Sequence, residues 1–588
     1  MEVPKKLLNS VDSCVDEALS GIISSNSGLS LLKGHRVVVR SDLETLRNRV
    51  ALVSGGGSGH EPAHAGYVGA GMLSAAVAGS VFASPPPSSV LAAILTLRQA
   101  GASGVLLIVK NYTGDRLNFG LALEQARARG VPVAMVIVAD DCAFVQPSKA
   151  GRRGLCGTLL IHKMAGALAE EGRSLDEIVT IVTEAVKDIG TLGVSMSPCS
   201  VPGCVPSFEL PPGEMELGLG IHGEAGIQRL KIGSADEVVK IMIDHMTNPT
   251  SQSHLPLNTG DTVVLCVNNL GALSCLEMAV VTRAALTCLE GRGVRVARVT
   301  SGTFMTSLEM TGVSLTLMRT DEERLRLFDA KTTAPNWPNL SRGAVSGRNC
   351  IVELPKSVLA TELSAEKEGP LSAVTRRVLE AVCTTLLNQR EELNTLDRAS
   401  GDGDCGNTHA LAARAIQEWI HSHVIPGCPG KVLSALAGLV QEHMGGSSGA
   451  LYSLFLTAAA TPLSGRSDSA AWADALHAGT EAMRRYGGAD PGDRTMLDAL
   501  CPALDELRKL SEVPPGGEMA IWQAAVQKAE SGAESTRNLT ARAGRASYVA
   551  AERVTLPDPG AVAVAAILRT VIAALGSDNE TSRKLRPD

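Results

Sequence analysis

Aromatic residues are scarce in this chain of 588 residues. Phenylalanine, tryptophan and tyrosine together make up 3% of the sequence, whereas glycine occurs 59 times. This balance indicates many tight turns and close contacts between helices and strands, rather than recognition surfaces built from aromatic side chains. Basic residues are not in excess either, because the formal net charge is −7. We therefore expect no nucleic-acid partner, since its phosphates would require a basic face.

Paired metal-binding cysteines and a targeting segment are also missing. The thirteen cysteines include no C-x-x-C pair, and nothing near the closest two, Cys199 and Cys204, completes a zinc site. We interpret them as reduced thiols of a cytosolic protein. The first residues lack the apolar core of a signal peptide. Arg569 interrupts the apolar run over 561–568, so we expect no membrane-spanning helix and no membrane partner.

The two halves of the chain differ in their periodicity. A length of 588 residues suits three or four domains with substantial cores. Short β-rich runs alternate with helical patterns over the first 330 residues, which predicts an α/β fold in two lobes that divide near 190–212. The predicted strands are 37–39, 50–53, 104–109, 131–138, 262–267, 294–299 and 313–318, with a helix over 116–129.

Residues 332–369 are rich in Pro, Ser, Asn and Gly and are predicted to be a linker. About eight helical segments follow between 371 and 575, which predicts an all-α second half. We place the domain boundaries at 9–337 for the α/β domain, 338–370 for the linker, 371–577 for the all-α domain and 578–588 for a tail.

An acidic, glycine-rich turn follows the first long helical pattern of the second half. Apolar residues recur at helical spacing up to Leu396, so Asp397 is expected at the helix end, with Asp402 and Asp404 on the turn. Three converging carboxylates repel one another, which would raise their pKa values. A hard cation such as Mg²⁺ relieves this repulsion and leaves coordination sites for phosphate. The alternative is a solvated acidic turn without a metal.

A second glycine-rich stretch, Ser54–Gly59, directly follows a predicted strand and offers backbone N–H groups to ligand oxygens. It is neither a Walker loop nor a dinucleotide fingerprint, because the required residues do not follow. The next residues, His60–His64, match the H-E-x-x-H pattern of zinc proteases. The third ligand is missing, since Tyr67 and Ala70 stand where an extended motif has Gly and His. We therefore reject the protease interpretation.

Two further residues carry groups suited to catalysis. Asp115 closes the segment that leaves the end of the strand 104–109, and open α/β sheets bind ligands at that edge. It is a candidate general base, and the alternative is an N-cap for a helix beginning at Arg116. His222 lies among four glycines, which would leave its imidazole accessible to a small substrate. A neutral imidazole can attack a carbonyl carbon, although a lone histidine is commonly structural.

Motifs along the whole chain resemble those of the animal dihydroxyacetone kinases, the triokinase/FMN cyclase family. In the first half these motifs are GGGSGHEPAHAG, KNYTGDRLNFG, GRRGLCGT, ELGLGIHGEAG and HMTN. In the second half they are LDRASGDGDCGNTH, MGGSSGALY, PGDRTMLDAL, AGRASY and PDPGAVA. The resemblance implies a two-lobed α/β substrate domain followed by an all-α nucleotide domain, a barrel of eight antiparallel helices.

The resemblance also implies a role for each matched residue of the substrate domain. His222 would add covalently to the carbonyl of dihydroxyacetone or glyceraldehyde, forming a hemiaminal that glycerol cannot form. Asp115 would take the proton of the attacking hydroxyl, with His60 as a further catalytic residue. The substrate would be held by Gly57, Ser58, Gly59, His60, Lys110 and Asp115.

For the nucleotide domain, the resemblance implies ATP bound through Mg²⁺ on Asp397, Asp402 and Asp404. The implied nucleotide contacts are Asp402, Gly403, Asp404, Cys405, Ser447, Ser448, Gly487, Thr495, Met496, Pro557, Asp558, Pro559 and Gly560. The segment 445–449 precedes an apolar helix, whose N-terminus suits phosphate. A second activity is implied at the same site, the cleavage of FAD to AMP and cyclic FMN with Mn²⁺ or Co²⁺.

A cytosolic homodimer that pairs domains of different subunits is a further implication of the resemblance. Two alternatives to an ATP-dependent kinase remain. One is a phosphotransferase-type kinase that keeps bound ADP, although such systems carry the two domains on separate chains. The other is a non-catalytic regulator, because the animal family is also linked to an innate immune RNA helicase as a partner.

Overall fold

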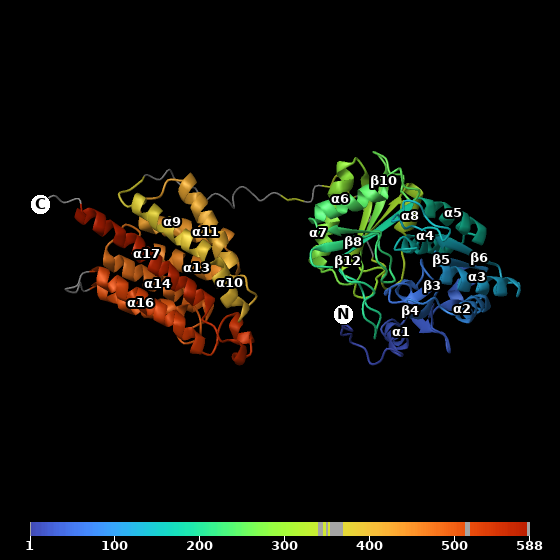
Figure 1. Ribbon diagram of the computed structural model, residues 1–588, viewed down its shortest axis with the longest axis horizontal. Coiled ribbons are helices and arrows are strands. Elements are labelled where there is room, and N and C mark those ends of the chain that lie inside the picture. The colour runs from blue at the N-terminus through green and yellow to red at the C-terminus, as the bar shows by residue number, and fades with distance from the viewer. Residues whose placement is uncertain (1, 339–344, 349–350, 353–367, 512–517, 585–588) are drawn as a thin grey trace. The chain divides into compact units, whose positions relative to one another are not determined.

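The computed structural model describes residues 2–338, 345–348, 351–352, 368–511 and 518–584. The chain divides into two compact units, Met1–Glu353 and Leu354–Asp588. Figure 1 shows strands and helices in the first unit, whereas the second is built from helices. The predicted fold class, an α/β domain followed by an all-α domain, is therefore confirmed.

The N-terminal sheet of the first unit has the strand order β1-β2-β4-β3-β5-β6. Its strands are β1 (Leu29–Leu31), β2 (Val37–Arg40), β3 (Val50–Ser58), β4 (Ala75–Val81), β5 (Gly104–Lys110) and β6 (Val133–Val138). The four strands from β4 to β6 run parallel, and β2 and β1 add antiparallel pairs at one edge. Parallel strands require crossover connections, which the helices between them supply.

Both faces of this sheet are covered, so its central strand β5 is apolar on both faces from Val105 to Val109. In β5, Val105, Leu107 and Val109 pack on one side, and Leu106 and Ile108 pack on the other. One face carries α2 (Pro87–Gln99) and α3 (Thr113–Arg127). The core on the other face includes residues of α1 (Cys14–Ser24), α4 (Thr158–Glu170), α5 (Leu175–Lys187) and α8 (Glu322–Phe328).

The second sheet of this unit has the order β11-β10-β12-β7-β8-β9. Its strands are β7 (Ile189–Ser195), β8 (Glu214–Leu217), β9 (Gln228–Lys231), β10 (Thr262–Asn269), β11 (Arg295–Gly302) and β12 (Gly312–Arg319). The helices α6 (Ala235–Met246) and α7 (Cys275–Gly291) pack on it. The core on α4 also includes residues of β10 and β12, so α4 connects the two sheets and is buried along nearly all its length.

Three sequence-based expectations for this unit need correction. The lobes divide earlier than 190–212, because Ile189–Ser195 is already a strand of the second sheet. The glycine-rich residues up to Ser58 continue β3 and pair with β4 instead of forming a loop. Helix α3 begins at Thr113 rather than Arg116, and its N-cap is Tyr112. The interpretation of Asp115 as a helix cap is therefore wrong.

The described part of the second unit contains nine α-helices. They are α9 (Ser372–Asn388), α10 (Arg390–Arg398), α11 (Cys405–Ser422), α12 (Pro429–His443), α13 (Gly446–Ala460), α14 (Ser469–Gly487), α15 (Leu497–Leu507), α16 (Glu518–Ser535) and α17 (Pro559–Lys584). Each neighbour from α11 to α17 contacts the next, and α9 contacts both α11 and α17. Eight helices, α9 and α11 to α17, thus close into a ring. The first predicted helical segment is two helices, α9 and α10, because the helix is interrupted at Gln389.

Helix α17 includes an 18-residue stretch, Pro559–Gly576, that is long and apolar enough to cross a membrane by length and composition. Arg569, which interrupts the apolar run in the sequence, lies within this helix. The stretch packs against α9, α15 and α16. Its residues Ala561, Val564 and Ala565 belong to the buried core of the ring, which accounts for much of its apolar composition.

Candidate active sites

The first candidate site lies at the end of β3, where successive glycines allow an unusually close approach of neighbouring chains. A Cβ atom on Gly57 would lie 2.7 Å from the backbone nitrogen of Ala83. A Cβ atom on Gly56 would lie 2.8 Å from Nζ of Lys110. Gly56 also has φ +158°, which L side chains rarely adopt. Both glycines are therefore needed for packing, and Gly57 is also a candidate for substrate contact.

His222 is surrounded by three rings that come from the ends of parallel strands. Its ring centroid lies 4.9 Å from that of His60, 5.4 Å from Phe82 and 4.5 Å from Tyr112. His60 follows β3, Phe82 follows β4 and Tyr112 follows β5, so the carboxyl edge of the sheet gathers them. The neighbouring glycines therefore do not leave the imidazole open, and His222 is half-buried within an aromatic cage.

Both imidazoles at this site favour the neutral form. Burial lowers the pKa of His222. The carboxylates of Glu224 and Asp115 oppose this change, and the positive charges of Lys110 and Arg153 add to it. Burial, together with the charges of His222 and Lys110, holds the pKa of His60 well below its usual range. A neutral His222 retains the lone pair that nucleophilic attack requires.

The hydrogen bonds of His60 leave one ring nitrogen free. Its Nδ1 donates to the carbonyl oxygen of Thr306 at 2.8 Å. Its Nε2 is buried and has no hydrogen-bond partner in the described part of the chain. With Nδ1 carrying the proton, Nε2 is an acceptor available to a hydroxyl group of a ligand.

Lys110 and Asp115 are brought together beside Gly56. Lys110 ends β5 and is 1% exposed, and Asp115 lies in the first turn of α3 and is 3% exposed. Ser84 donates a short hydrogen bond to the carboxylate of Asp115. Burial lowers the pKa of Lys110, whereas the carboxylates of Asp115 and Asp140 oppose this change. A carboxylate and an ammonium thus share one buried position next to the aromatic cage.

The other predicted substrate contacts already have partners within the protein. The hydroxyl of Ser58 donates to the carbonyl oxygen of Gly79 at 2.8 Å, so its oxygen is left as an acceptor. The backbone N–H of Gly59 donates to the carboxylate of Glu61 at 3.0 Å. A ligand that used the N–H of Gly59 would have to displace Glu61.

The second candidate site is the acidic turn between α10 and α11. Asp397 lies in the last turn of α10, as the sequence predicts, and Asp402 and Asp404 lie on the turn. The Asp397 carboxylate accepts hydrogen bonds from the backbone N–H groups of Asp404 and Cys405, at 2.9 and 3.1 Å. One oxygen from each of the three carboxylates lies within 4.8 Å of the others, the only such acidic, His or Cys cluster in the described residues. These hard oxygen donors fit a divalent cation such as Mg²⁺.

The charges around this turn are not all repulsive. Burial and the negative charges of Asp402 and Asp397 raise the pKa of Asp404. Burial acts in the same upward direction on Asp402, but its ion pair with Arg545 prevails and lowers the pKa of Asp402. The expectation that repulsion raises the pKa of every carboxylate is therefore wrong for Asp402. Sequence reasoning missed Arg545, although it belongs to the AGRASY motif.

A pocket of about 220 Å³ lies within the second unit and is bordered at one side by the three carboxylates. Of the predicted contacts, it is lined by Asp397, Asp402, Asp404, Cys405, Ser447, Ser448, Thr495, Met496, Asp558, Pro559 and Gly560. Gly403, Gly487 and Pro557 do not line it, although Gly487 packs against the lining residue Leu451. The N-terminus of α13 at Gly446 faces the pocket, which suits an anionic group such as phosphate.

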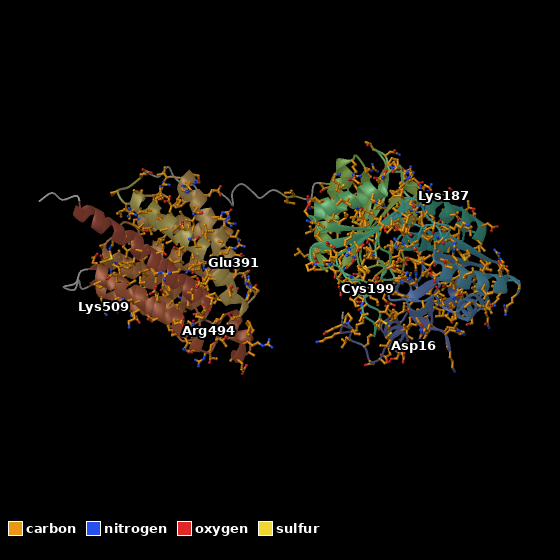
Figure 2. All side chains as sticks on the ribbon, viewed as in Figure 1. Asp16, Lys187, Cys199, Glu391, Arg494 and Lys509 are labelled. Atoms are coloured by element: carbon orange, nitrogen blue, oxygen red, sulfur yellow. The ribbon has the colours of Figure 1, made fainter. Side chains whose placement is uncertain are left out.

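Arg494, which is labelled in Figure 2, was missed by sequence reasoning. It also lines this pocket. Its side chain is buried, and its Nη2 donates to the carbonyl oxygen of Leu556 at 2.7 Å. Its Nη1 lies 3.8 Å from the carboxylate of Asp558. Its Nε and Nη1 have no hydrogen-bond partner in the described residues. Its place beside Thr495 in the PGDRTMLDAL motif was the available signal.

Comparison with known proteins shows the same two-part organisation. Residues 20–336 match the Dak1 domain model and residues 399–573 match the DAK2 domain model. The human protein named triokinase/FMN cyclase is 56% identical over 574 residues, which cover 97% of this chain and 100% of the human protein. The chain belongs to the animal dihydroxyacetone kinase family. The bovine member with the same name is 57% identical, over 97% of this chain and 99% of its own length.

Solved structures of the family extend the likeness to bacteria. The native dihydroxyacetone kinase of C. freundii is 36% identical, with a TM-score of 0.64 and coverage of 97% of this chain and 99% of that one. A second structure of the C. freundii enzyme, in complex with AMP-PNP and Mg²⁺, matches with a TM-score of 0.64 and 35% identity.

Proposed function

We propose that the protein transfers the γ-phosphate of ATP to dihydroxyacetone and glyceraldehyde. The observation that carries this proposal is the imidazole of His222, which lies in the aromatic cage beside the buried Lys110 and Asp115. The proposal is supported by relatives named triokinase/FMN cyclase and by a family structure that holds AMP-PNP and Mg²⁺.

In the substrate unit, capture of the carbonyl by His222 would come first. The imidazole lone pair forms a C–N bond to the carbonyl carbon, and the π electrons move to oxygen. That oxygen takes up a proton while the other ring nitrogen releases one, so the adduct is neutral. The resulting hemiaminal positions a terminal hydroxyl, which gives a rate advantage by restricting its motion. Glycerol has no carbonyl and cannot be held in this way.

The other residues would then act on the hydroxyl that attacks phosphorus. Asp115 accepts its proton, while Nε2 of His60 accepts a hydrogen bond from a substrate hydroxyl. Lys110 donates to a substrate oxygen. Ser58 offers its hydroxyl oxygen as an acceptor, and Gly57 gives access to the backbone.

In the nucleotide unit, Asp397, Asp402 and Asp404 would hold Mg²⁺, which neutralises phosphate charge when it is bound. Ser447 and Ser448 at the N-terminus of α13 bind phosphate oxygens. The adenosine part is bound by the remaining predicted contacts, Cys405, Gly487, Thr495, Met496 and 557–560. Phosphoryl transfer needs mainly in-line positioning and charge neutralisation, which this set supplies.

A second activity, cleavage of FAD to AMP and cyclic FMN, is favoured by the name that the mammalian relatives carry. In this reaction a ribityl hydroxyl attacks the flavin-side phosphorus, and the bond to the oxygen of AMP breaks. The same carboxylates would hold Mn²⁺ or Co²⁺. The pocket lies within a single unit, so this activity would not need the triose site.

We also propose a cytosolic homodimer. The described residues include twelve cysteines, and all are free, as is usual in a reducing compartment. Pairing of domains between subunits and binding to an innate immune RNA helicase stay predictions from the family resemblance. The complete set of catalytic side chains argues against regulation as the sole role.

One coupled assay tests these proposals. The purified protein is incubated with ATP and Mg²⁺ and with dihydroxyacetone, glyceraldehyde or glycerol, and separately with FAD and Mn²⁺. We expect phosphorylation of both trioses, little turnover of glycerol, and release of AMP from FAD. Absence of triose phosphorylation with ATP alone would favour the phosphotransferase-type alternative.

A further inference from the structure

The second histidine of the H-E-P-A-H segment, His64, has no part in the proposed reaction, yet it contacts Lys110 of the proposed substrate site. His64 is buried, with 6% of its surface exposed. Its Nε2 lies 2.8 Å from Nζ of Lys110. Its other nitrogen, Nδ1, lies 3.5 Å from Oγ of Ser54.

The hydrogen bonds around His64 define its tautomer. The hydroxyl of Ser54 donates to the carbonyl oxygen of Ile108 at 2.7 Å, so its oxygen can only accept from Nδ1 of His64. The ammonium of Lys110 has donors and no lone pair, so it must donate to Nε2. Both contacts are satisfied by a neutral imidazole with its proton on Nδ1.

The surroundings keep this imidazole uncharged. Burial holds the pKa of His64 well below its usual range, and positive charge on Lys110, His162 and His60 acts in the same direction. The ring centroid of His162 on α4 lies 5.2 Å from that of His64. His162 is itself buried, and neither of its ring nitrogens has a hydrogen-bond partner among the described residues. Burial lowers the pKa of His162 to about 3.

A neutral acceptor suits the position of Lys110. The ammonium fills the space that Gly56 leaves open, where a Cβ atom would lie 2.8 Å from Nζ. A carboxylate in place of His64 would neutralise the positive charge of Lys110. A neutral imidazole instead fixes the direction of the ammonium, whose charge can then act on Asp115 and the substrate. The charged and titratable groups around this ammonium are His60, His64, Asp115, Asp140, His162 and His222.

We propose that His64 is a positioning residue for triose phosphorylation, whose neutral imidazole accepts a hydrogen bond from Lys110 and fixes the ammonium against Gly56 and Asp115. This inference rests on the proposed kinase function. Lysine side chains are flexible, and holding one in a single direction costs conformational entropy that a fixed acceptor offsets. A buried ammonium that loses its acceptor also shifts toward the neutral amine.

The test compares His64→Leu, which removes the acceptor, with His64→Gln, whose amide oxygen can replace Nε2. With dihydroxyacetone as substrate, we expect His64→Leu to lower kcat/KM by about 10- to 100-fold, the range that a misplaced catalytic group produces. The active form of the protein carries a charged Lys110, and loss of the acceptor lowers the pKa of Lys110 further. The alkaline limb of the kcat/KM profile should therefore move to lower pH, and His64→Gln should restore the limb and most of the activity.

A matched control separates positioning from packing. His162→Leu removes a neighbouring buried imidazole that makes no hydrogen bond in the described structure, so it should change the melting temperature without moving the alkaline limb. A merely structural His64 predicts that His64→Leu behaves in the same way, and that result would overturn the proposal. If His64→Leu does not fold, His64→Asn replaces it in the test, because the shorter asparagine amide does not reach Nζ of Lys110. His64→Asn should then move the alkaline limb to lower pH, whereas His64→Gln should not.

The outcomes also distinguish this inference from the function on which it rests. Wild-type protein that fails to phosphorylate dihydroxyacetone would refute the proposed kinase activity. A different result would refute only the positioning role. In that case wild type is active, and a folded His64→Leu variant keeps kcat/KM within about twofold and the alkaline limb of its pH profile at the same pH.

Discussion

The guanidinium of Arg494 lies 3.8 Å from the carboxylate of Asp558, and both side chains border the proposed nucleotide pocket. Arg494 also donates to the carbonyl oxygen of Leu556, two residues before Asp558. One buried cation therefore holds both the backbone and the side chain of this turn. Because two of its nitrogens have no hydrogen-bond partner in the described residues, its charge is incompletely compensated.

We predict that Arg494→Met weakens nucleotide binding more than it affects the triose site. Loss of the bond to Leu556 frees the turn that carries Asp558, and loss of the charge removes positive potential beside the phosphates. The KM for ATP should rise by roughly tenfold, which corresponds to about 1.4 kcal/mol. Steady-state kinetics with ATP and with dihydroxyacetone measure both constants. An unchanged KM for ATP would show that Arg494 has no role in forming this pocket.

The pKa of Asp558 gives a pH-dependent prediction. Burial raises it to about 6, which the neighbouring Arg494 only partly opposes. A raised carboxyl pKa means that the folded state binds a proton more tightly than the unfolded chain, so the contribution to stability grows as pH falls and is lost as pH rises through 6. Between pH 7 and pH 5, wild type should gain about 1 kcal/mol of unfolding free energy relative to Asp558→Asn.

Thermal unfolding of the two proteins over this pH range, without nucleotide or metal, measures the difference directly. Other titrating groups cancel because they are present in both proteins. A difference that stays constant with pH would mean that Asp558 keeps an ordinary pKa.

We predict that Asp404→Ala abolishes both triose phosphorylation and FAD cleavage, because both reactions need metal at the phosphates. Folding should survive, since the lost group is a carboxylate that its neighbours repel on a turn. Asp505→Ala, on the exposed face of α15, is the matched control and should keep both activities. Retention of either activity by purified Asp404→Ala would separate the two reactions into different sites.

The ring of helices should function by itself. A fragment over 371–588 contains all nine helices of the described second unit and the whole nucleotide pocket. It should unfold cooperatively and cleave FAD, while losing triose phosphorylation. Circular dichroism melts and the two assays check this. An inactive fragment from an active parent would show that FAD cleavage needs residues of the first unit.

Local sequence patterns predicted the positions of helix ends correctly wherever nearby residues determine the structure. The S-x-x-E spacing of Ser174 with Glu177 and of Ser234 with Glu237 is that of a capping box, and each pair forms the reciprocal hydrogen bonds of one. The helical spacing before Asp397 placed it correctly at the end of α10. In contrast, glycines have poor strand propensity, and Gly55 and Gly56 belong to β3 because they pair with β4.

The contacts that sequence could not supply join distant segments. His64 and Lys110 are 46 positions apart, and Arg494 and Leu556 are 62 apart. Neither pair has a spacing pattern, because each depends on how separate strands or helices pack. The aromatic cage around His222 likewise combines the ends of three strands with one later loop.

The covalent capture of a triose carbonyl by His222 is the central claim, and carbon-13 NMR of dihydroxyacetone labelled at its carbonyl carbon tests it most directly. With wild-type protein in excess, the ketone resonance should be replaced by a resonance of a tetrahedral carbon. In folded His222→Ala the ketone resonance should persist, and kinase turnover should fall by orders of magnitude while FAD cleavage continues. A ketone resonance that persists in saturated wild-type protein would contradict the claim.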